Sequence, residues 1–167
     1  RVGDGAGERR FRHDGHAAAQ VHVGAGERAV HEAEDVVRRK RVNQRAVVEK
    51  LCALEAAEDG ILFSSGMAAI SSVMMAFLSS GDHAVIQRDI YGGTHHFITA
   101  DFDRFRIEHS FVANRPEDIA AAVRPNTKLI YIESPSNPLL LITDIAAVAK
   151  IGRDRHIVTA IDNTFAS

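Results

Sequence analysis

The sequence has little of what marks a secreted, membrane-spanning or nucleic-acid-binding protein. Cys52 is its only cysteine, which excludes an intramolecular disulfide framework and a cysteine-based metal site and favours a reducing, cytoplasmic location. No stretch approaches the ~20 apolar residues of a transmembrane helix, and the N-terminus lacks the apolar core of a signal peptide. The formal net charge is -2, and no run of Lys and Arg is interleaved with aromatic residues. We therefore expect neither a nucleic-acid nor a membrane partner.

The first 42 residues lack the side chains that build a core. They contain no Leu, Ile, Met, Tyr or Trp, and Phe11 is their only aromatic residue. We interpret residues 1–42 as a low-order segment and residues 43–167 as part of one folded domain. Val, Ala, Gly, Asp and Glu, whose codons all begin with G, fill 27 of the 42 positions, which suggests a GC-rich frame translated out of register. An authentic disordered tail is the alternative hypothesis.

Two patterns within residues 1–42 are weak. Residues 24–29 match the dinucleotide-binding pattern G-x-G-x-x-A, but the preceding strand would be three residues long and no acidic strand end follows at the usual interval. Four histidines lie in the same segment without a helix or strand to arrange them, so we predict no metal site.

From residue 43 onward, short apolar segments alternate with helical patterns. An amphipathic helix is predicted to stop near Asp59-Gly60. Strands are predicted over residues 61–63, 83–87, 107–112, 128–133 and 157–161, and helices over residues 67–78, 116–123 and 144–152, with one more ending near residue 102. This alternation predicts an α/β fold with a mostly parallel sheet and helices on both faces. Ligands of such sheets bind at the carboxyl ends of the strands.

One stretch combines these elements into a potential anion site. The apolar residues 61–63 lead into Ser65, Gly66 and Met67, and a helix without Pro or internal Gly begins there. The first N–H groups of a helix have no intrahelical acceptor and carry the positive end of the helix dipole, and a glycine lets a phosphate approach closely. We therefore predict that Ser65–Met67 forms a phosphate-binding turn, here called the phosphate cup.

Other polar groups follow the remaining strands. Tyr91-Gly92-Gly93 follows the strand at 83–87, a polar loop runs from Glu133 to Asn137, and Asp162 follows the last strand. A phosphorylated, protonatable aromatic ring requires such parts: a cup for its phosphate, an aromatic residue against its face and a carboxylate for its ring nitrogen. The implied ligand is pyridoxal 5'-phosphate.

Five ordered motifs carry a resemblance to a known family. They are Phe63-Ser64-Ser65-Gly66-Met67-Ala68-Ala69, Tyr91-Gly92-Gly93-Thr94, Arg124-Pro125-Asn126-Thr127-Lys128, Glu133-Ser134-Pro135-Ser136-Asn137-Pro138 and Asp162-Asn163-Thr164-Phe165. With them, residues 43–167 resemble the Cys/Met-metabolism (trans-sulfuration) family of pyridoxal-phosphate enzymes, which includes cystathionine γ-synthase, cystathionine γ-lyase and methionine γ-lyase. The resemblance implies part of the large domain of a fold type I pyridoxal-phosphate enzyme.

The resemblance also implies residue roles. The N–H groups of the phosphate cup would bind the cofactor phosphate, and Tyr91 would stack on the ring and assist proton transfer. Asp162 would pair with the pyridine nitrogen, and Asn137 would lie near the ring hydroxyl and the substrate carboxylate. Glu133 would support the loop that carries Asn137. The expected reaction is elimination or replacement at the γ-carbon, less often the β-carbon, of a sulfur-containing or O-activated amino acid. Full-length members are expected to be homo-oligomers.

The chain departs from the family in two places. The Schiff-base lysine of the family lies beyond the Asp162 motif and is absent, and Lys40, Lys50, Lys128 and Lys150 do not align with it. A Tyr-x-Arg motif expected before residue 43 and the small C-terminal domain are absent too. We therefore expect a fragment without turnover that binds the cofactor weakly or not at all. The alternatives are a non-catalytic binding module and another fold type I enzyme, such as an aminotransferase.

Overall fold

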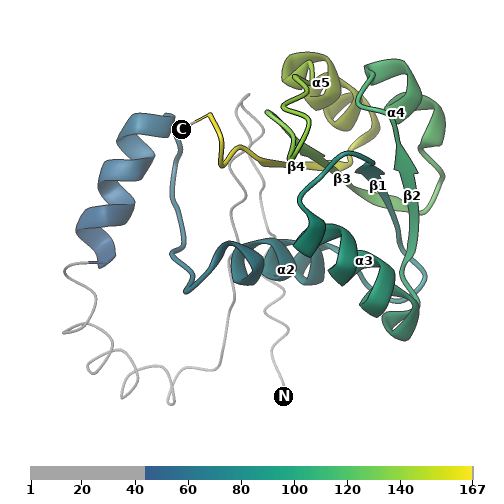
Figure 1. Ribbon diagram of the computed structural model, residues 1–167, viewed down its shortest axis with the longest axis horizontal. Helices are drawn as coiled ribbons and strands as arrows, with labels where there is room; N and C mark the ends of the chain where they lie inside the picture. Colours follow the sequence, from purple (N-terminus) through teal and green to yellow (C-terminus); the bar gives the residue numbers. More distant parts are fainter. Residues whose placement is uncertain (1–43, 167) are drawn as a thin grey trace, which may run out of the picture.

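The computed structural model describes residues 44–166, which form a four-stranded sheet flanked by helices (Figure 1). After a first helix over residues 44–55, the elements are α2 (Gly66–Phe77), β1 (His83–Gln87), α3 (Gly92–Phe105), β2 (Glu108–Val112), α4 (Pro116–Ala122), β3 (Thr127–Glu133), α5 (Ile145–Arg155) and β4 (Val158–Asp162). Within the described residues, no helix is long and apolar enough to cross a membrane.

All four strands run parallel, in the spatial order β2-β1-β3-β4. The two central strands, β1 and β3, are almost entirely buried, whereas the edge strands are only partly buried. A continuous apolar run such as Leu129–Ile132 fits a central position because both of its faces are covered. The predicted parallel α/β fold is confirmed.

The helices divide between the two faces of the sheet. In Figure 1, α2 and α3 lie on one side and α4 and α5 on the other. The core on the α2 and α3 side contains Met74, Ile98 and Phe102, and the core on the α4 and α5 side contains Ile119 and Val148. Because successive strand residues point to opposite faces, Tyr131 and Glu133 of β3 lie on the α2 and α3 side.

The prediction of a strand over Ile61–Phe63 is wrong. These residues are irregular, and their side chains are 48%, 40% and 39% exposed. An apolar triplet has the local preference of a strand, but a strand also needs a neighbouring strand for its backbone hydrogen bonds, and the described sheet has none at this place. The other predicted strands and helices are present, with ends that differ by a few residues.

The first helix differs from its prediction mainly in where it ends. It stops at residue 55, four residues before Asp59, and Ala56 follows with a positive φ of 51°. Its apolar side chains Val47 and Leu51 are about half exposed, and Leu54 is 78% exposed. Figure 1 shows this helix apart from the sheet and its covering helices.

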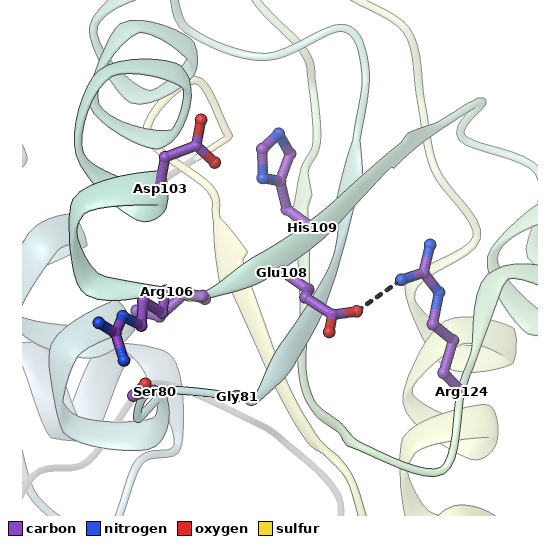
Figure 2. A pocket seen from close by; sticks show the side chains of 8 residues that line it. Ser80, Gly81, Asp103, Arg106, Glu108, His109 and Arg124 are labelled. Carbon is purple, nitrogen blue, oxygen red and sulfur yellow. Dashed lines mark hydrogen bonds and ion pairs between the residues drawn. The ribbon is translucent and has the colours of Figure 1, made fainter.

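The amino ends of the strands enclose a shallow hollow. Figure 2 shows Gly81, Arg106, Glu108 and Arg124 around it, with an ion pair between Glu108 and Arg124. These residues precede or begin β1, β2 and β3. The hollow therefore lies at the edge of the sheet opposite to the predicted ligand site.

Candidate active site

The phosphate cup is the N-terminus of α2. Ser65 is the N-cap residue, and its hydroxyl oxygen accepts a hydrogen bond from the Ala68 N–H at 3.1 Å. The Ala69 N–H donates to the Ser65 carbonyl. Within residues 44–166, the N–H groups of Gly66 and Met67 have no acceptor, as expected for the first turn of a helix. A methyl group on Gly66 would meet no atom within 4 Å, so the space beside these donors is open.

Tyr91 lies next to the phosphate cup because α2 and α3 begin at the same edge of the sheet. A Cβ atom placed on Gly93 would lie 2.5 Å from Tyr91 Cε1 and 3.1 Å from Met67 Sδ. The tyrosine ring therefore covers Gly93 and stands beside the first turn of α2, with 44% of the residue exposed. The sequence predicted a glycine-flanked tyrosine at this edge but not that Gly93 makes room for its ring.

Glu133 and Asn137 follow β3 at the same edge. The Glu133 carboxylate accepts the Tyr91 N–H at 2.7 Å and the Asn137 N–H at 2.6 Å. Burial raises the pKa of the Glu133 carboxyl, the two N–H donors lower it, and the negative charge of Asp162 raises it further. The predicted support of the Asn137 loop by Glu133 is thus present, and it extends to Tyr91.

Asp162 ends β4 directly beside Glu133 in the β3 and β4 register. Its Oδ1 atom accepts the Thr164 N–H at 3.1 Å and the Thr164 hydroxyl at 2.5 Å, which fixes the orientation of the carboxylate. The Ser134 N–H donates to the Asp162 carbonyl at 3.1 Å. The last residues of β3 and β4 are therefore held together, with both carboxylates on the face that α2 and α3 cover.

Tyr131 is a polar residue of this region that the sequence analysis did not single out. It is 2% exposed, and its hydroxyl lies near the Thr94 and Asp162 side chains without a well-formed hydrogen bond to either. Burial raises the pKa of the Tyr131 phenol, and the negative charge of Asp162 raises it further, so the phenol stays protonated. The sequence signal was a tyrosine inside the apolar run 129–132, two residues before Glu133 on the same face.

The donor set at this edge fits a phosphorylated pyridine ring. Free N–H groups at a helix start suit a phosphate, an exposed aromatic face suits a ring, and a carboxylate suits a basic ring nitrogen. Among residues 44–166, no group of three or more His, Cys, Asp and Glu side chains is arranged to hold a metal ion. The structure brings the predicted residues to one edge, and their binding roles stay predictions.

None of the described lysines belongs to the segments that form this site. Lys50 is on the helix over residues 44–55, and Lys128 is exposed near the start of β3, at the amino edge. Lys150 is on α5, where its ammonium group pairs with Asp154. Lys40 lies outside the described residues. The three lysines lie on the elements where the sequence analysis placed them, and the absence of the Schiff-base lysine stays a prediction.

Comparison with known proteins identifies the class to which this site belongs. The family model of Cys/Met metabolism PLP-dependent enzymes matches residues 15–167, a range that includes most of the N-terminal segment. The chain therefore belongs to the Cys/Met metabolism family of pyridoxal-phosphate-dependent enzymes, as the resemblance predicted. The predicted cofactor and enzyme class of the family are confirmed with it. The predicted boundary at residue 43 falls at the limit of the described residues and stays a prediction.

Individual relatives are similar over one part of their length. Cystathionine beta-lyase MetC of Bacillus subtilis is 45% identical over 134 residues, which cover 80% of this chain and 34% of that protein. Cystathionine gamma-lyase of the same organism is 50% identical over 113 residues, covering 67% of this chain and 30% of the relative. The crystal structure of cystathionine gamma-lyase from Lactobacillus plantarum complexed with L-serine superimposes with a TM-score of 0.68 at 44% identity, over 70% of this chain and 31% of that one. The chain thus spans about a third of the length of these relatives.

Proposed function

We propose that residues 44–166 form the phosphate-binding and ring-facing part of the active site of a trans-sulfuration enzyme. The observation that carries the proposal is the convergence of the phosphate cup, Tyr91 and Asp162 at the carboxyl edge of one parallel sheet. The family match favours a trans-sulfuration enzyme over an aminotransferase. The substrate would be a small amino acid. The single cysteine favours a location of the protein in a reducing cytoplasm.

In this proposal each residue acts on a defined part of the ligand. The N–H groups of Gly66 and Met67 bind the phosphate, and the Ser65 hydroxyl, which caps α2, stands beside them. Asp162, oriented by Thr164, keeps the pyridine nitrogen protonated. Pyridoxal phosphate, when bound, supplies an electron-poor ring that makes the α-carbon of an amino acid acidic. Tyr91 covers one ring face and exchanges protons with the substrate, and Asn137 orients the substrate carboxylate.

The phosphate cup can be tested with a pair of glycine variants. Gly66→Ala puts a methyl group into the open space beside the free N–H donors, whereas Gly92→Ala puts one into open space at the start of α3. We expect Gly66→Ala to weaken binding of pyridoxine 5'-phosphate several-fold and Gly92→Ala to leave it unchanged. The phosphate ester lacks the aldehyde, so it does not react with surface lysines, and its binding is followed through the amide resonances of an isotope-labelled chain.

Pyridoxine, which has the ring but no phosphate, is the matched ligand. It is expected to leave the Gly66 and Met67 amide resonances nearly unmoved. Equal perturbation by the two ligands, or equal weakening in the two glycine variants, would show that the start of α2 is not the phosphate site.

The reaction at the γ-carbon is the second part of the proposal. It requires removal of a proton from the α-carbon and then from the β-carbon, whereas β-chemistry requires only the first. We expect the complete enzyme that contains this segment to exchange both the α- and β-protons of its amino-acid substrate with solvent deuterium. Exchange confined to the α-carbon, measured by proton NMR of the substrate, would assign it to β-chemistry.

The 167-residue polypeptide itself is proposed to be without turnover. None of its described lysines belongs to the segments that form the proposed site, since they lie on the first helix, near the start of β3 and on α5. We expect weak, reversible binding of pyridoxal phosphate without a site-specific covalent bond. Borohydride reduction followed by peptide mass spectrometry tests this, and a single stoichiometric lysine adduct would contradict it.

A further inference from the structure

Glu133 contacts two segments of the site that are far apart in the sequence. Its Oε2 atom accepts the Tyr91 N–H at 2.7 Å, and its Oε1 atom accepts the Asn137 N–H at 2.6 Å. Hydrogen bonds from N–H groups to a carboxylate are among the stronger ones in proteins. One side chain therefore ties the turn before α3 to the loop after β3.

The position of Glu133 is itself fixed by buried contacts. Gln87, at the end of β1, is fully buried, and its side-chain amide donates to the carbonyl of Glu133 at 2.9 Å and to that of Asp89 at 3.1 Å. The Gln87 amide oxygen accepts the Thr143 hydroxyl at 2.9 Å. The backbone from which the Glu133 carboxylate projects thus has little freedom to move.

No basic side chain approaches the Glu133 carboxylate closely enough to form an ion pair among the described residues. The residue is 4% exposed, so the two N–H donors are its main compensation for lost hydration. The ionisable groups that act on it are Asp162 of β4 and the Tyr131 phenol of β3, whereas Tyr91 contacts it through its backbone N–H. Such an arrangement is costly for a residue with no more than a packing role.

We propose that Glu133 is a positioning residue that couples Tyr91 to Asn137, so that both take up their places at the carboxyl edge together. Loss of the carboxylate releases the two segments at once, because each is held by one of its oxygen atoms. The coupling follows from the contacts alone, and its use in ligand binding rests on the function proposed above.

The coupling can be measured in the unmodified chain without any cofactor. Both amide protons donate to the same carboxylate, so the Tyr91 and Asn137 amide resonances should move with pH along one shared titration curve. Its midpoint should lie above 4.5, the ordinary pKa of a glutamate, because burial disfavours the charged form. Separate midpoints for the two amides, or no titration of either, would overturn the proposal.

Two variants extend the test. Glu133→Gln keeps the shape but presents an N–H group to one of the two donors, and it should abolish the shared titration and raise hydrogen exchange at one or both amides about tenfold. Glu108→Gln is the matched control, since Glu108 is an exposed glutamate at the opposite edge, and it should change neither amide. Unchanged exchange at both amides in Glu133→Gln would count against the coupling even if that variant is less stable.

Ligand binding separates this inference from the proposed function. Pyridoxine 5'-phosphate is expected to perturb the Tyr91 and Asn137 amides in the unmodified chain and to bind several-fold more weakly to Glu133→Gln. A shared titration in the free chain without any effect of pyridoxine 5'-phosphate would support the coupling and refute the proposed function. Equal affinity of the two proteins for the phosphate ester would overturn the positioning role in ligand binding.

Discussion

At the amino edge of the sheet, side chains at the starts of β1, β2 and β3 form a hydrogen-bonded network, whereas at the carboxyl edge the first N–H groups of α2 have no acceptor among the described residues. Both ring nitrogens of His83 are hydrogen-bonded, to the hydroxyls of Thr127 and Ser110, and Arg124 donates to the same two hydroxyls. The Arg124 guanidinium also pairs with Glu108. The polar side chains at the starts of β1, β2 and β3 thus bind one another, whereas the buried Thr159 hydroxyl near the start of β4 has no partner among the described residues.

The carboxyl edge differs in the hydrogen bonding of its backbone N–H groups. The N–H groups of Gly66 and Met67 have no acceptor within residues 44–166 and lie beside open space. N–H groups of this kind at the start of a helix are open to solvent in the free chain and can bind an anion. The comparison favours the carboxyl edge over the hollow at the amino edge as the place of the proposed ligand.

The largest effect expected at the amino edge is a pH dependence from His83. Burial and the positive charge of Arg124 lower the pKa of His83 from 6.5 to about 4. The unfolded chain therefore takes up a proton near pH 6.5 that the folded chain accepts only near pH 4. The contribution of His83 to the free energy of unfolding is therefore fully present above pH 6.5. It is lost as the pH falls from 6.5 toward 4, by about 3 kcal/mol in total.

Urea unfolding of the chain and of His83→Gln at pH 7 and pH 4.5 measures this contribution. The loss of unfolding free energy between the two pH values should be smaller in the variant by about 2 kcal/mol. Glu133, whose raised pKa acts in the opposite direction, is common to both proteins and cancels. Replacement of the exposed His96 by Gln is the control, and an equal effect there would remove His83 as the cause.

Much of the fold could be predicted because its signals are local. The strand 83–87 was predicted with its observed ends, since an apolar run between a Gly-Asp turn and a polar segment has few other readings. Residues 61–63 show the limit of that method. They have the same apolar composition as a buried strand. Whether they form a strand depends on pairing with a neighbouring strand, which the segment's own sequence does not determine.

The site was predictable to a similar extent. Parallel strands bring their carboxyl ends to one edge, so Tyr91, Glu133 and Asp162 could be placed near one another from the order of elements alone. The contacts of Glu133 with two backbone N–H groups could not be predicted, because they depend on how separate loops fold back. The same holds for the two adjacent glycines, since only the structure shows that Gly93 is covered and Gly92 is not.

A smaller effect is expected from the glycine under the tyrosine ring. Gly93→Ala would place a Cβ atom 2.5 Å from Tyr91 Cε1, which forces the ring away from α3. Because the ring is partly exposed and can rotate outward, the cost in unfolding free energy should be about 1 kcal/mol. Gly92→Ala, with open space around it, should cost less than half of that. Equal Tm values for the two variants would mean that the ring does not rest on Gly93.

The smallest effect is expected from the ion pair at the amino edge. Glu108 and Arg124 lie 2.8 Å apart, but their side chains are 53% and 47% exposed, so solvent screens their attraction. Glu108→Gln should lower the unfolding free energy by no more than about 0.5 kcal/mol. The difference should shrink further in 1 M salt, where the screening length is about 3 Å. Urea unfolding at low and high salt provides the measurement. A loss of more than about 1 kcal/mol that persists in high salt would show that this edge depends on its charges, and it would weaken the contrast drawn between the two edges.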